Sequence, residues 1–466
     1  MTSRYGYAGA MLSSGKKIVF ALLVLAAVAV VGTVILTWLE RGGYIASERV
    51  DDRVQHPPVH LLEKRGDTWV IGGVDMLTGT LPAVKDARSF RILAIGGSFL
   101  MGFPYTKPGM AMPGEAGIPH WLQLELTQRY PSRRFEVLNL SAAGQDSTRC
   151  LKVLKAFLAV EPDLVVVGTG NNEGSLPPSR FNEALHEWIA YRLLKKALLR
   201  PPDFAARPLF TPQDPDLRKI EDNFENNVRA VVALCAEARV PLVMLTMPIN
   251  LRYGGLDSRG HDSPTPEPVL DEWMRKGRRL QEKKKWNEAI EAFAKSRNQA
   301  AGAYLIAQCY EKLERHEQAR EFYRLVAQIN PLTRTRPSYN AFIRQLAGDG
   351  GFTLVDLERI LERRSAYGIP NPELFLDYCH LKWWAYLLLS QPVSRSIAAS
   401  GVIPPSDREP RPAPSALELI RAGGLAPDLM NKPESADFDK FQQAWETADE
   451  TLPTALDPLT VFPPVL

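Results

Sequence analysis

Closely spaced cysteines are missing from this chain of 466 residues. Its four cysteines lie far apart and show none of the short intervals typical of metal clusters or disulfide-rich domains: Cys150, Cys235, Cys309 and Cys379. We therefore predict mostly buried single thiols instead of a disulfide framework. One disulfide remains an alternative if the domain is exported.

An excess of charge of one sign is also missing. The formal net charge is +3, with acidic and basic residues spread evenly, so the charge does not support nucleic acid as a partner. The chain is 45% hydrophobic and 23% charged, which are ordinary values for a globular protein and exclude broad disorder. Its length exceeds what one core usually holds and predicts two or three units.

Convincing cofactor and metal motifs are absent as well. The glycine-rich segment at residues 168–174 has one residue too many before its third glycine, so it does not fit a dinucleotide fingerprint. His56 and His60 are separated by two prolines and a valine, which prevents a helical pair of metal ligands. We predict no cofactor and no metal.

A long hydrophobic run is present near the amino end. Residues 18–39 have about the length that spans a bilayer as a helix and predict one transmembrane anchor. More positive charge precedes this run than follows it, so residues 1–17 are expected in the cytoplasm and everything after residue 39 outside it, in the periplasm. A cleaved signal peptide is the alternative, although the run is long for a signal core. Residues 40–90 are expected to form a juxtamembrane segment with room for one hairpin.

Short apolar segments alternate with helical patterns after residue 90. The expected strands cover residues 92–95, 135–140, 164–167, 241–247 and 352–357. They lack polar alternation, which is typical of a parallel sheet covered on both faces. The expected helices between them cover residues 119–129, 148–159 and 216–238. This order predicts a three-layer α/β fold with a doubly wound parallel sheet, in two parts at residues 91–250 and 350–400.

The gap before the last strand holds helical patterns of its own at residues 268–331. Aligned on itself at a shift of 30 residues, the segment superposes small and aromatic positions: Gly277 on Ala307, Ala289 on Ala319 and Phe293 on Tyr323. The pattern resembles two tetratricopeptide (TPR) repeats, which implies paired helices and a possible protein or peptide partner. A helical hairpin with accidental similarity is the alternative. Prolines make the start of residues 401–466 a linker, followed by a tail to which we assign no function.

Residues that can supply a polar side chain or an accessible backbone N–H group follow four of the expected strands. They are Ser98, Gly144, Asn171, Asn172, Asp377 and His380. Because the carboxyl ends of parallel strands lie at one edge of a sheet, we expect these distant residues to meet in one crevice.

The residue types in this set suit acyl transfer. A serine hydroxyl needs a base, and His380 can serve because imidazole titrates near neutral pH. Asp377 can hold the tautomer of His380 that receives the proton from Ser98. The oxyanion that forms on an attacked carbonyl needs fixed donors. The candidates are the backbone N–H groups of Ser98 and Gly144 and the side chain of Asn172, with Asn171 as the substitute.

These motifs resemble those of the SGNH, or GDSL-like, hydrolase superfamily over roughly residues 90–250 and 350–390. The resemblance implies a flavodoxin-like hydrolase fold with Ser98 as nucleophile, Gly144 and Asn172 as oxyanion donors, His380 as base and Asp377 as the carboxylate that orients it. Two positions depart from the family pattern. Gly97 stands where the family usually has aspartate, and Glu173 stands for the aspartate that usually follows the asparagine.

We therefore expect a membrane-anchored, exported serine esterase or acyl hydrolase that acts on carbohydrate or lipid esters through an acyl-enzyme. Two alternatives stay open. The acyl group could pass to a sugar hydroxyl of an exported polysaccharide, as in an O-acyltransferase. The hydrolase fold could also be inactive and serve as a membrane-tethered TPR scaffold.

Overall fold

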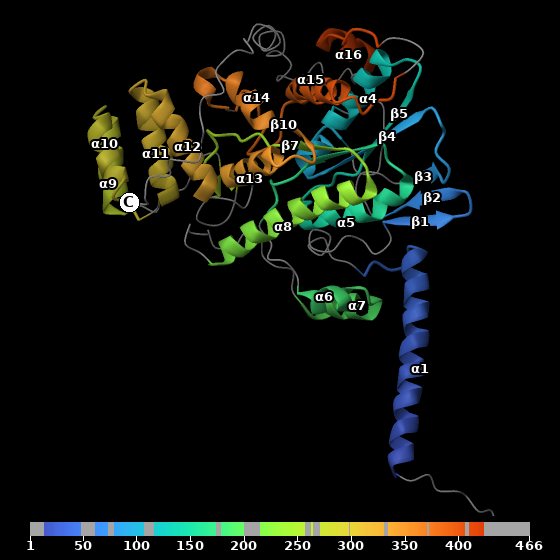
Figure 1. Ribbon diagram of the computed structural model, residues 1–466. Coiled ribbons are helices and arrows are strands. Elements are labelled where there is room, and N and C mark those ends of the chain that lie inside the picture. Colours follow the sequence, from blue (N-terminus) through green and yellow to red (C-terminus); the bar gives the residue numbers. More distant parts are fainter. Residues whose placement is uncertain are drawn as a thin grey trace, which may run out of the picture. The chain divides into compact units, whose positions relative to one another are not determined.

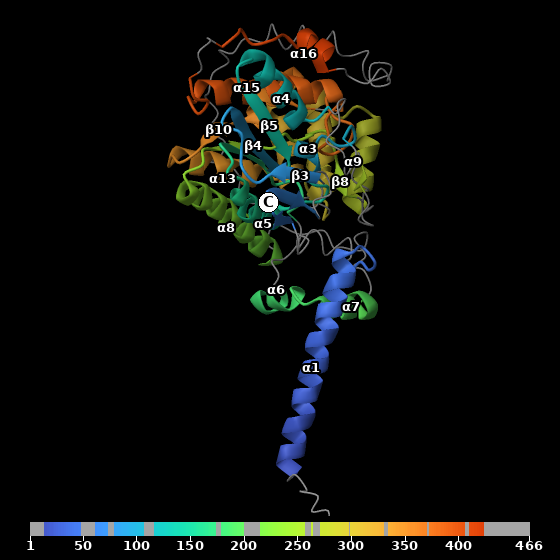
Figure 2. The same ribbon diagram turned by 90° about the vertical axis from the view of Figure 1, so that its right-hand side faces the viewer.

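The computed structural model describes residues 14–47, 61–72, 79–106, 116–173, 179–199, 215–256, 262–263, 271–297, 299–329, 334–370, 372–405 and 410–423. The expectations for His56, His60, residues 1–13 and the tail after residue 423 lie outside these ranges. The chain divides into two compact units (Figures 1 and 2). The smaller comprises Met1–His56 and Pro178–Pro202, and the larger comprises Pro57–Pro177 and Asp203–Leu466.

The smaller unit contains the apolar helix α1 (Ser14–Arg41), followed in this unit by α6 (Arg180–His186) and α7 (Ile189–Leu198). Within α1, Lys17–Arg41 is long and apolar enough to cross a membrane, and none of its apolar window is buried by protein. Arg192 on α7 holds the end of α1, because its guanidinium bonds the Glu40 carboxylate at 2.6 Å and the Ser47 hydroxyl at 2.8 Å. A signal sequence would pass the same length and composition test, so membrane anchoring stays a prediction.

The larger unit is built on a five-stranded sheet in which every neighbouring pair is parallel. Its strands are β4 (Ser89–Gly96), β5 (Arg134–Asn139), β6 (Leu164–Gly168), β7 (Leu242–Leu245) and β10 (Thr353–Val355). The predicted parallel sheet is therefore confirmed, and all five expected strands are present. The spatial order is β10-β7-β6-β4-β5, so the chain reverses its direction of winding after β5. The crevice of such a doubly wound sheet opens at this switch point, between the carboxyl ends of β4 and β6.

Two helical layers cover the sheet (Figure 1). One layer contains α4 (Ile118–Arg129), α14 (Leu357–Arg363), α15 (Trp383–Ala399) and α16 (Ala416–Gly423), and the other contains α5 (Ser147–Phe157), α8 (Pro215–Ala238) and α13 (Pro337–Gly348). Successive side chains of β4 enter opposite cores, as the pleat of a strand requires. Ile92 and Ala94 pack with the first layer, whereas Leu93 and Ile95 pack with the second. Burial on both faces explains why the strands lack polar alternation.

Two small antiparallel sheets are separate from the parallel sheet, and Ile71 of the first packs into the core on the side of α5 and α8. The first joins β1 (Leu62–Arg65), β2 (Thr68–Ile71) and β3 (Gly79–Pro82), so this segment forms three strands where we expected room for one hairpin. The second joins β8 (Gly255–Leu256) and β9 (Asp262–Ser263).

The helical segment between β7 and β10 forms two antiparallel pairs, which we call the insert (Figure 1). Its helices are α9 (Glu272–Glu282), α10 (Trp286–Phe293), α11 (Gln299–Lys312) and α12 (His316–Ile329). Small residues permit close approach within each pair, because Ala289, Ala307 and Ala319 are completely buried. The helical pairing agrees with the sequence pattern, while the assignment to TPR repeats stays a prediction.

Gly277 provides a test of this close packing. A Cβ atom at Gly277 would lie 2.3 Å from the Phe293 ring. Gly277→Ala is expected to destabilise the insert by about 1–2 kcal/mol, because overpacking outweighs the gain in helix propensity. Urea denaturation followed by circular dichroism measures the change. Gly348→Ala is the matched control, since nothing lies within 4 Å of its Cβ, and a similar or higher stability is expected there. Equal stability of the two variants would contradict the tight contact.

Candidate active site

Ser98 lies in a sharp turn between β4 and the short helix α3 (Ser98–Met101). Gly97 precedes the helix in extended conformation, with φ −82° and ψ −167°. Gly96 must be small, since a Cβ there would lie 2.3 Å from the Gly168 carbonyl oxygen on β6. The backbone N–H of Ser98 lies at the open end of α3, where a helix provides no acceptor of its own. The turn therefore presents both the hydroxyl and the N–H of Ser98 at the switch point of the sheet.

Asp377 and His380 share one loop that comes just before α15. The Oδ1 atom of Asp377 accepts hydrogen bonds from the backbone N–H groups of Cys379 at 2.9 Å and His380 at 2.8 Å. An aspartate that bonds its own backbone two and three residues on stabilises a tight turn. The Asp377 carbonyl oxygen accepts a further bond of 2.7 Å from the side-chain amide of Asn250, which follows β7. Short-range and long-range bonds therefore fix the position of this loop.

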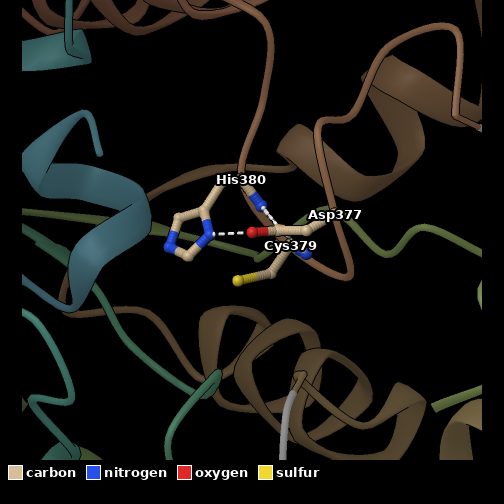
Figure 3. A group of neighbouring side chains, drawn as sticks. All are labelled: Asp377, Cys379 and His380. Carbon is tan, nitrogen blue, oxygen red and sulfur yellow. Dashed lines mark hydrogen bonds and ion pairs between the residues drawn. The ribbon is translucent and has the colours of Figure 1, made fainter. Parts of the chain in front are cut away.

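The structure brings Ser98, His380 and Asp377 together in one chain of hydrogen bonds. Nε2 of His380 is 2.7 Å from Oγ of Ser98, and its Nδ1 is 2.6 Å from Oδ2 of Asp377 (Figure 3). His380 is 5% exposed and Ser98 is 7% exposed, so water has little access to either group. In this geometry the imidazole can accept the hydroxyl proton while the carboxylate stabilises the imidazolium that results.

The electrostatics of the Asp377 carboxyl favour its charged form. Burial alone would raise its pKa, but the hydrogen bond and charge of His380, together with the two backbone N–H donors, hold the pKa below its usual value. Asp377 consequently stays ionised throughout the neutral range. Its contribution to stability is present above the ordinary aspartate pKa and is lost only as the pH falls through the lowered value.

Asp377, Cys379 and His380 also offer three possible metal ligands, whose atoms lie within 4.8 Å of one another (Figure 3). Both ring nitrogens of His380 are already hydrogen-bonded, and both carboxylate oxygens of Asp377 accept bonds. The group is therefore explained as part of the serine–histidine–aspartate chain and does not fit a metal centre well. All four cysteines are buried and none forms a disulfide, which confirms the expectation of single thiols.

The two candidate asparagines after β6 point to different neighbours. The side-chain Nδ2 of Asn172 donates to the Gln145 carbonyl at 3.0 Å, beside the Ser98 turn. Asn171 is buried, and its Oδ1 accepts the Thr335 N–H at 3.0 Å. Asn172 is therefore the amide next to the nucleophile turn, and this geometry favours it over Asn171 as an oxyanion donor.

The absence of a side chain at position 97 has a direct structural reason. A Cβ at this position would lie 2.6 Å from Nδ2 of Asn172 and 3.2 Å from the Gln145 carbonyl oxygen. The missing side chain leaves the space that the Asn172 amide occupies. Gly144, the other expected donor, has φ +69°, a conformation that favours glycine, and lies in the loop that also carries Gln145. The glycine in place of the usual aspartate at position 97 therefore leaves the space that the side chain of Asn172 needs.

Glu173 joins the two loops that carry the candidate oxyanion donors. Its Oε1 accepts the Ser147 N–H at 2.8 Å, and its Oε2 accepts the Ser147 hydroxyl at 2.8 Å. The Thr169 hydroxyl adds a bond of 3.2 Å. Burial, and next the charge of nearby Asp146, raise the pKa of Glu173 above its usual value. Glu173 thus ties the first residue of α5, just after the Gly144 loop, to the loop that carries Asn172.

The raised pKa of Glu173 predicts a pH-dependent stability. A carboxyl with a raised pKa in the folded state contributes stability at low pH and loses it as the pH rises through the folded value. Wild-type protein is therefore expected to melt at a lower temperature at pH 8 than at pH 5. Glu173→Gln should reduce this difference, because the amide keeps the shape and can still pair with Ser147. Thermal melting at both pH values measures the effect, with Glu288→Gln as an exposed control. An unchanged difference in Glu173→Gln would refute the assignment.

Two functional candidates were missed from the sequence, Asn250 and Arg334. Asn250 bonds the Asp377 loop, and Arg334 bonds the carbonyl oxygens of Asn250 and Tyr253. Asn250 follows a strand that ends in the same crevice, and this position was the available signal. Arg334 carried no such signal, because it follows the insert and not a strand.

Comparisons with known proteins return structural similarities only. No family model matches the chain. No curated protein sequence matches it either.

Three solved structures illustrate the similarities. A protein described as an acylhydrolase from Bacteroides fragilis is 12% identical, with 66% of this chain and 87% of that chain covered and a TM-score of 0.32. A GDSL-like lipase from Bacteroides thetaiotaomicron is 11% identical, with coverages of 66% and 88% and a TM-score of 0.30. An acetylxylan esterase from Geobacillus stearothermophilus is 13% identical, with coverages of 66% and 94% and a TM-score of 0.33. These scores are too low to establish a shared fold, and we base the function on the geometry of the site.

Proposed function

We propose that this protein is an SGNH/GDSL-type serine hydrolase that cleaves carboxylic esters. The observation that carries the proposal is the continuous chain of hydrogen bonds from Ser98 through His380 to Asp377, at 2.7 and 2.6 Å. Serine, histidine and aspartate in this order can generate a nucleophile at neutral pH. The neighbouring N–H groups and amide supply the donors that acyl transfer requires.

The reaction proceeds in two steps. His380 takes the hydroxyl proton of Ser98 as its oxygen attacks the ester carbonyl, and Asp377 stabilises the imidazolium. The Ser98 and Gly144 N–H groups and the Asn172 amide bind the oxyanion. His380 then protonates the departing alcohol, which leaves an acyl-enzyme. Water, deprotonated by the same imidazole, releases the acid and restores Ser98.

The finer parts of the proposal concern location and substrate. We place the catalytic unit outside the cytoplasm, tethered by α1, because residues 18–39 are apolar and are preceded by the stronger positive charge. Acylated carbohydrates or lipid esters are the proposed substrates, and the insert is a proposed site for a protein or peptide. The inactive-scaffold alternative loses its main motive, since the glycine at position 97 makes room for a candidate oxyanion donor.

The test is an ester assay on the full chain purified in detergent. Hydrolysis of 4-nitrophenyl acetate should show a burst of nitrophenol that approaches the amount of enzyme, because this activated ester acylates Ser98 faster than water removes the acetyl group. A fluorophosphonate should label the Ser98 hydroxyl, as peptide mass spectrometry would reveal. Absence of both turnover and labelling in folded protein would refute the proposal. Added oligosaccharide acceptors distinguish hydrolysis from transfer, since a transferase yields acylated sugar.

A further inference from the structure

Arg334 is a buried arginine at the end of the insert, between α12 and α13. It is 0% exposed, and its Nη1 donates to the carbonyl oxygens of Asn250 at 2.8 Å and Tyr253 at 2.5 Å. Carbonyl oxygens carry only partial charge and do not neutralise a guanidinium. Among the residues that the structure describes, Nε and Nη2 of Arg334 have no acceptor and no carboxylate pairs with the side chain.

Two other buried arginines of this unit are paired with acids. Arg336, two residues further on and also 0% exposed, bonds Glu221 through Nη1 at 2.8 Å, although its Nε and Nη2 also have no acceptor among the described residues. Arg91 bonds Glu136 at 3.0 Å. Such pairing is the rule, because an isolated buried charge costs several kcal/mol. The burial of Arg334 without an acid is therefore the exception that requires an explanation.

The two unpaired donors of Arg334 form a particular shape. Nε and Nη2 lie on one edge of the planar guanidinium, which matches the two oxygens of a carboxylate or phosphate. The same edge is occupied elsewhere in this protein. Arg344 uses Nε and Nη2 to hold the two oxygens of Asp356 at 2.7 and 2.8 Å. The unpaired Nε/Nη2 edge of Arg334 thus has the donor geometry that binds an oxyanion, although it is buried in this structure.

Arg334 is linked through its Nη1 atom to the loop that carries Asp377. Asn250, whose carbonyl oxygen accepts from Arg334, donates its side-chain amide to the Asp377 carbonyl at 2.7 Å. The ring of Tyr253 lies 6.0 Å from that of Tyr378, which lies 5.7 Å from the His380 ring. Arg334 is therefore connected to the triad through two hydrogen bonds and through one row of aromatic rings.

The charge of Arg334 persists at neutral pH. Burial lowers its pKa to about 10, and the neighbouring Tyr304 and Tyr253 oppose this effect. A group with that pKa is almost entirely protonated near pH 7. The site consequently holds a full positive charge with no anion from the described residues to balance it.

We propose that the Nε/Nη2 edge of Arg334 binds an oxyanion carried by the ester substrate, a carboxylate, sulfate or phosphate. This inference rests on the proposed function and narrows the substrate class to anionic esters. Arg334 is closed to solvent in the structure, so the anionic group displaces a neighbouring side chain as it enters. The guanidinium then exchanges an unbalanced charge for a bidentate ion pair.

Two esters of matched length test the proposal on the full chain. 4-Nitrophenyl hemisuccinate ends in a carboxylate, whereas 4-nitrophenyl butyrate has a methyl group near that position. Hydrogen bonds to charged groups contribute about 1.5–3 kcal/mol, so kcat/KM should favour the hemisuccinate by about 10- to 100-fold. A wild-type enzyme with no preference, or with a preference for the butyrate, overturns the proposal.

Substitutions show which side chain binds the carboxylate of the hemisuccinate. Arg334→Gln should remove the preference, and Arg334→Lys should retain only part of it, because lysine keeps the charge but loses the fork. Arg336→Gln is the matched control, since it removes a buried arginine of the same segment that already has an acid. Its preference ratio should equal that of wild type even if both activities fall. A ratio that Arg334→Gln leaves intact, in protein with a wild-type circular dichroism spectrum, assigns the anion to another site and refutes the proposal.

A binding measurement separates this inference from the catalytic one. Ser98→Ala protein, titrated calorimetrically with each intact ester, reports affinity without turnover. Tighter binding of the hemisuccinate that Arg334→Gln abolishes supports the site even if no ester is hydrolysed. Equal affinity for both esters contradicts it.

Free succinate, sulfate and phosphate, added to wild type and to Arg334→Gln during ester hydrolysis, show whether the site binds substrate or a separate anion. Inhibition of hemisuccinate hydrolysis that is competitive and requires Arg334 supports the substrate site, whereas Arg334-dependent stimulation of butyrate hydrolysis indicates a free effector and overturns the assignment to substrate.

Discussion

Ser98→Ala is expected to lower kcat for 4-nitrophenyl acetate by about 10⁴-fold or more, which is the usual consequence of removing a triad nucleophile. In the proposed mechanism the hydroxyl oxygen forms the acyl-enzyme, and it lies 2.7 Å from His380 Nε2. Substrate binding should change much less, so KM is expected to stay within a few-fold. Steady-state and burst kinetics on the purified full chain measure both quantities.

The other members of the triad should behave as one unit with Ser98. His380→Ala is expected to cost about as much as Ser98→Ala, and the double variant should be no worse, since residues that act together are not additive. Asp377→Asn should lower kcat by about 10⁴-fold, because the amide favours the wrong tautomer of His380. Cys379→Ala is the matched control from the same loop. A loss in Cys379→Ala equal to that in Ser98→Ala, with sensitivity to chelators, would favour metal ligation and contradict the serine mechanism.

Placing at position 97 the aspartate that is usual in the SGNH pattern is expected to lower the proposed esterase activity. In Gly97→Asp the new Cβ would lie 2.6 Å from Nδ2 of Asn172, so the asparagine must leave its present position. Loss of one oxyanion donor commonly lowers kcat by about 10²- to 10³-fold. We expect a decrease of that order in kcat for 4-nitrophenyl acetate, with a far smaller change in melting temperature.

A double-variant cycle shows whether Asn172 transmits this effect. Gly97→Ala should lower kcat in the wild-type background but have little further effect in Asn172→Ala, because the displaced amide is already absent. Gly168→Ala is the matched control at the end of the adjacent strand. Its Cβ would make ordinary contacts, the nearest at 3.4 Å to the Met247 sulfur, so nearly normal activity is expected. Undiminished activity in Gly97→Asp would show that Asn172 is not a required donor.

The sheet could be predicted from the sequence because its strands are short apolar runs without alternation. Burial on both faces produces this pattern, as the opposite packing of Leu93 and Ala94 demonstrates. The position of Ser98 could also be predicted, since it directly follows an expected strand and strand ends meet at one edge. The expectation that Asp377 and His380 lie at the end of the last strand was wrong, because α14 separates β10 from their loop, which leads into α15. The structure nevertheless brings this loop to Ser98. The catalytic roles that we assign to them stay predictions until kinetics test them.

Other features depended on distances that no local pattern encodes. Asn171 and Asn172 are adjacent and chemically identical, and only the backbone turn directs one toward Thr335 and the other toward Gln145. In the sequence, Gly97 is only a departure from the usual aspartate. The structure shows that the space left by its missing side chain is filled by Asn172, which lies 75 positions later in the chain. Arg334 lies outside every strand-end motif, and its unusual burial exists only in three dimensions. Side-chain partners chosen by tertiary packing are therefore the part that sequence reasoning could not reach.

The positions of Ser98 and His380 along the chain have a consequence for the synthesis of this protein on the ribosome. Ser98 follows the first strand of the parallel sheet and His380 follows the last, 282 positions later. A nascent chain that has already formed four of the five strands still has an unactivated serine. A prematurely terminated product that ends before residue 380 would be equally inert, however well it folds. The proposed esterase activity of this protein would therefore come only from chains translated past residue 380.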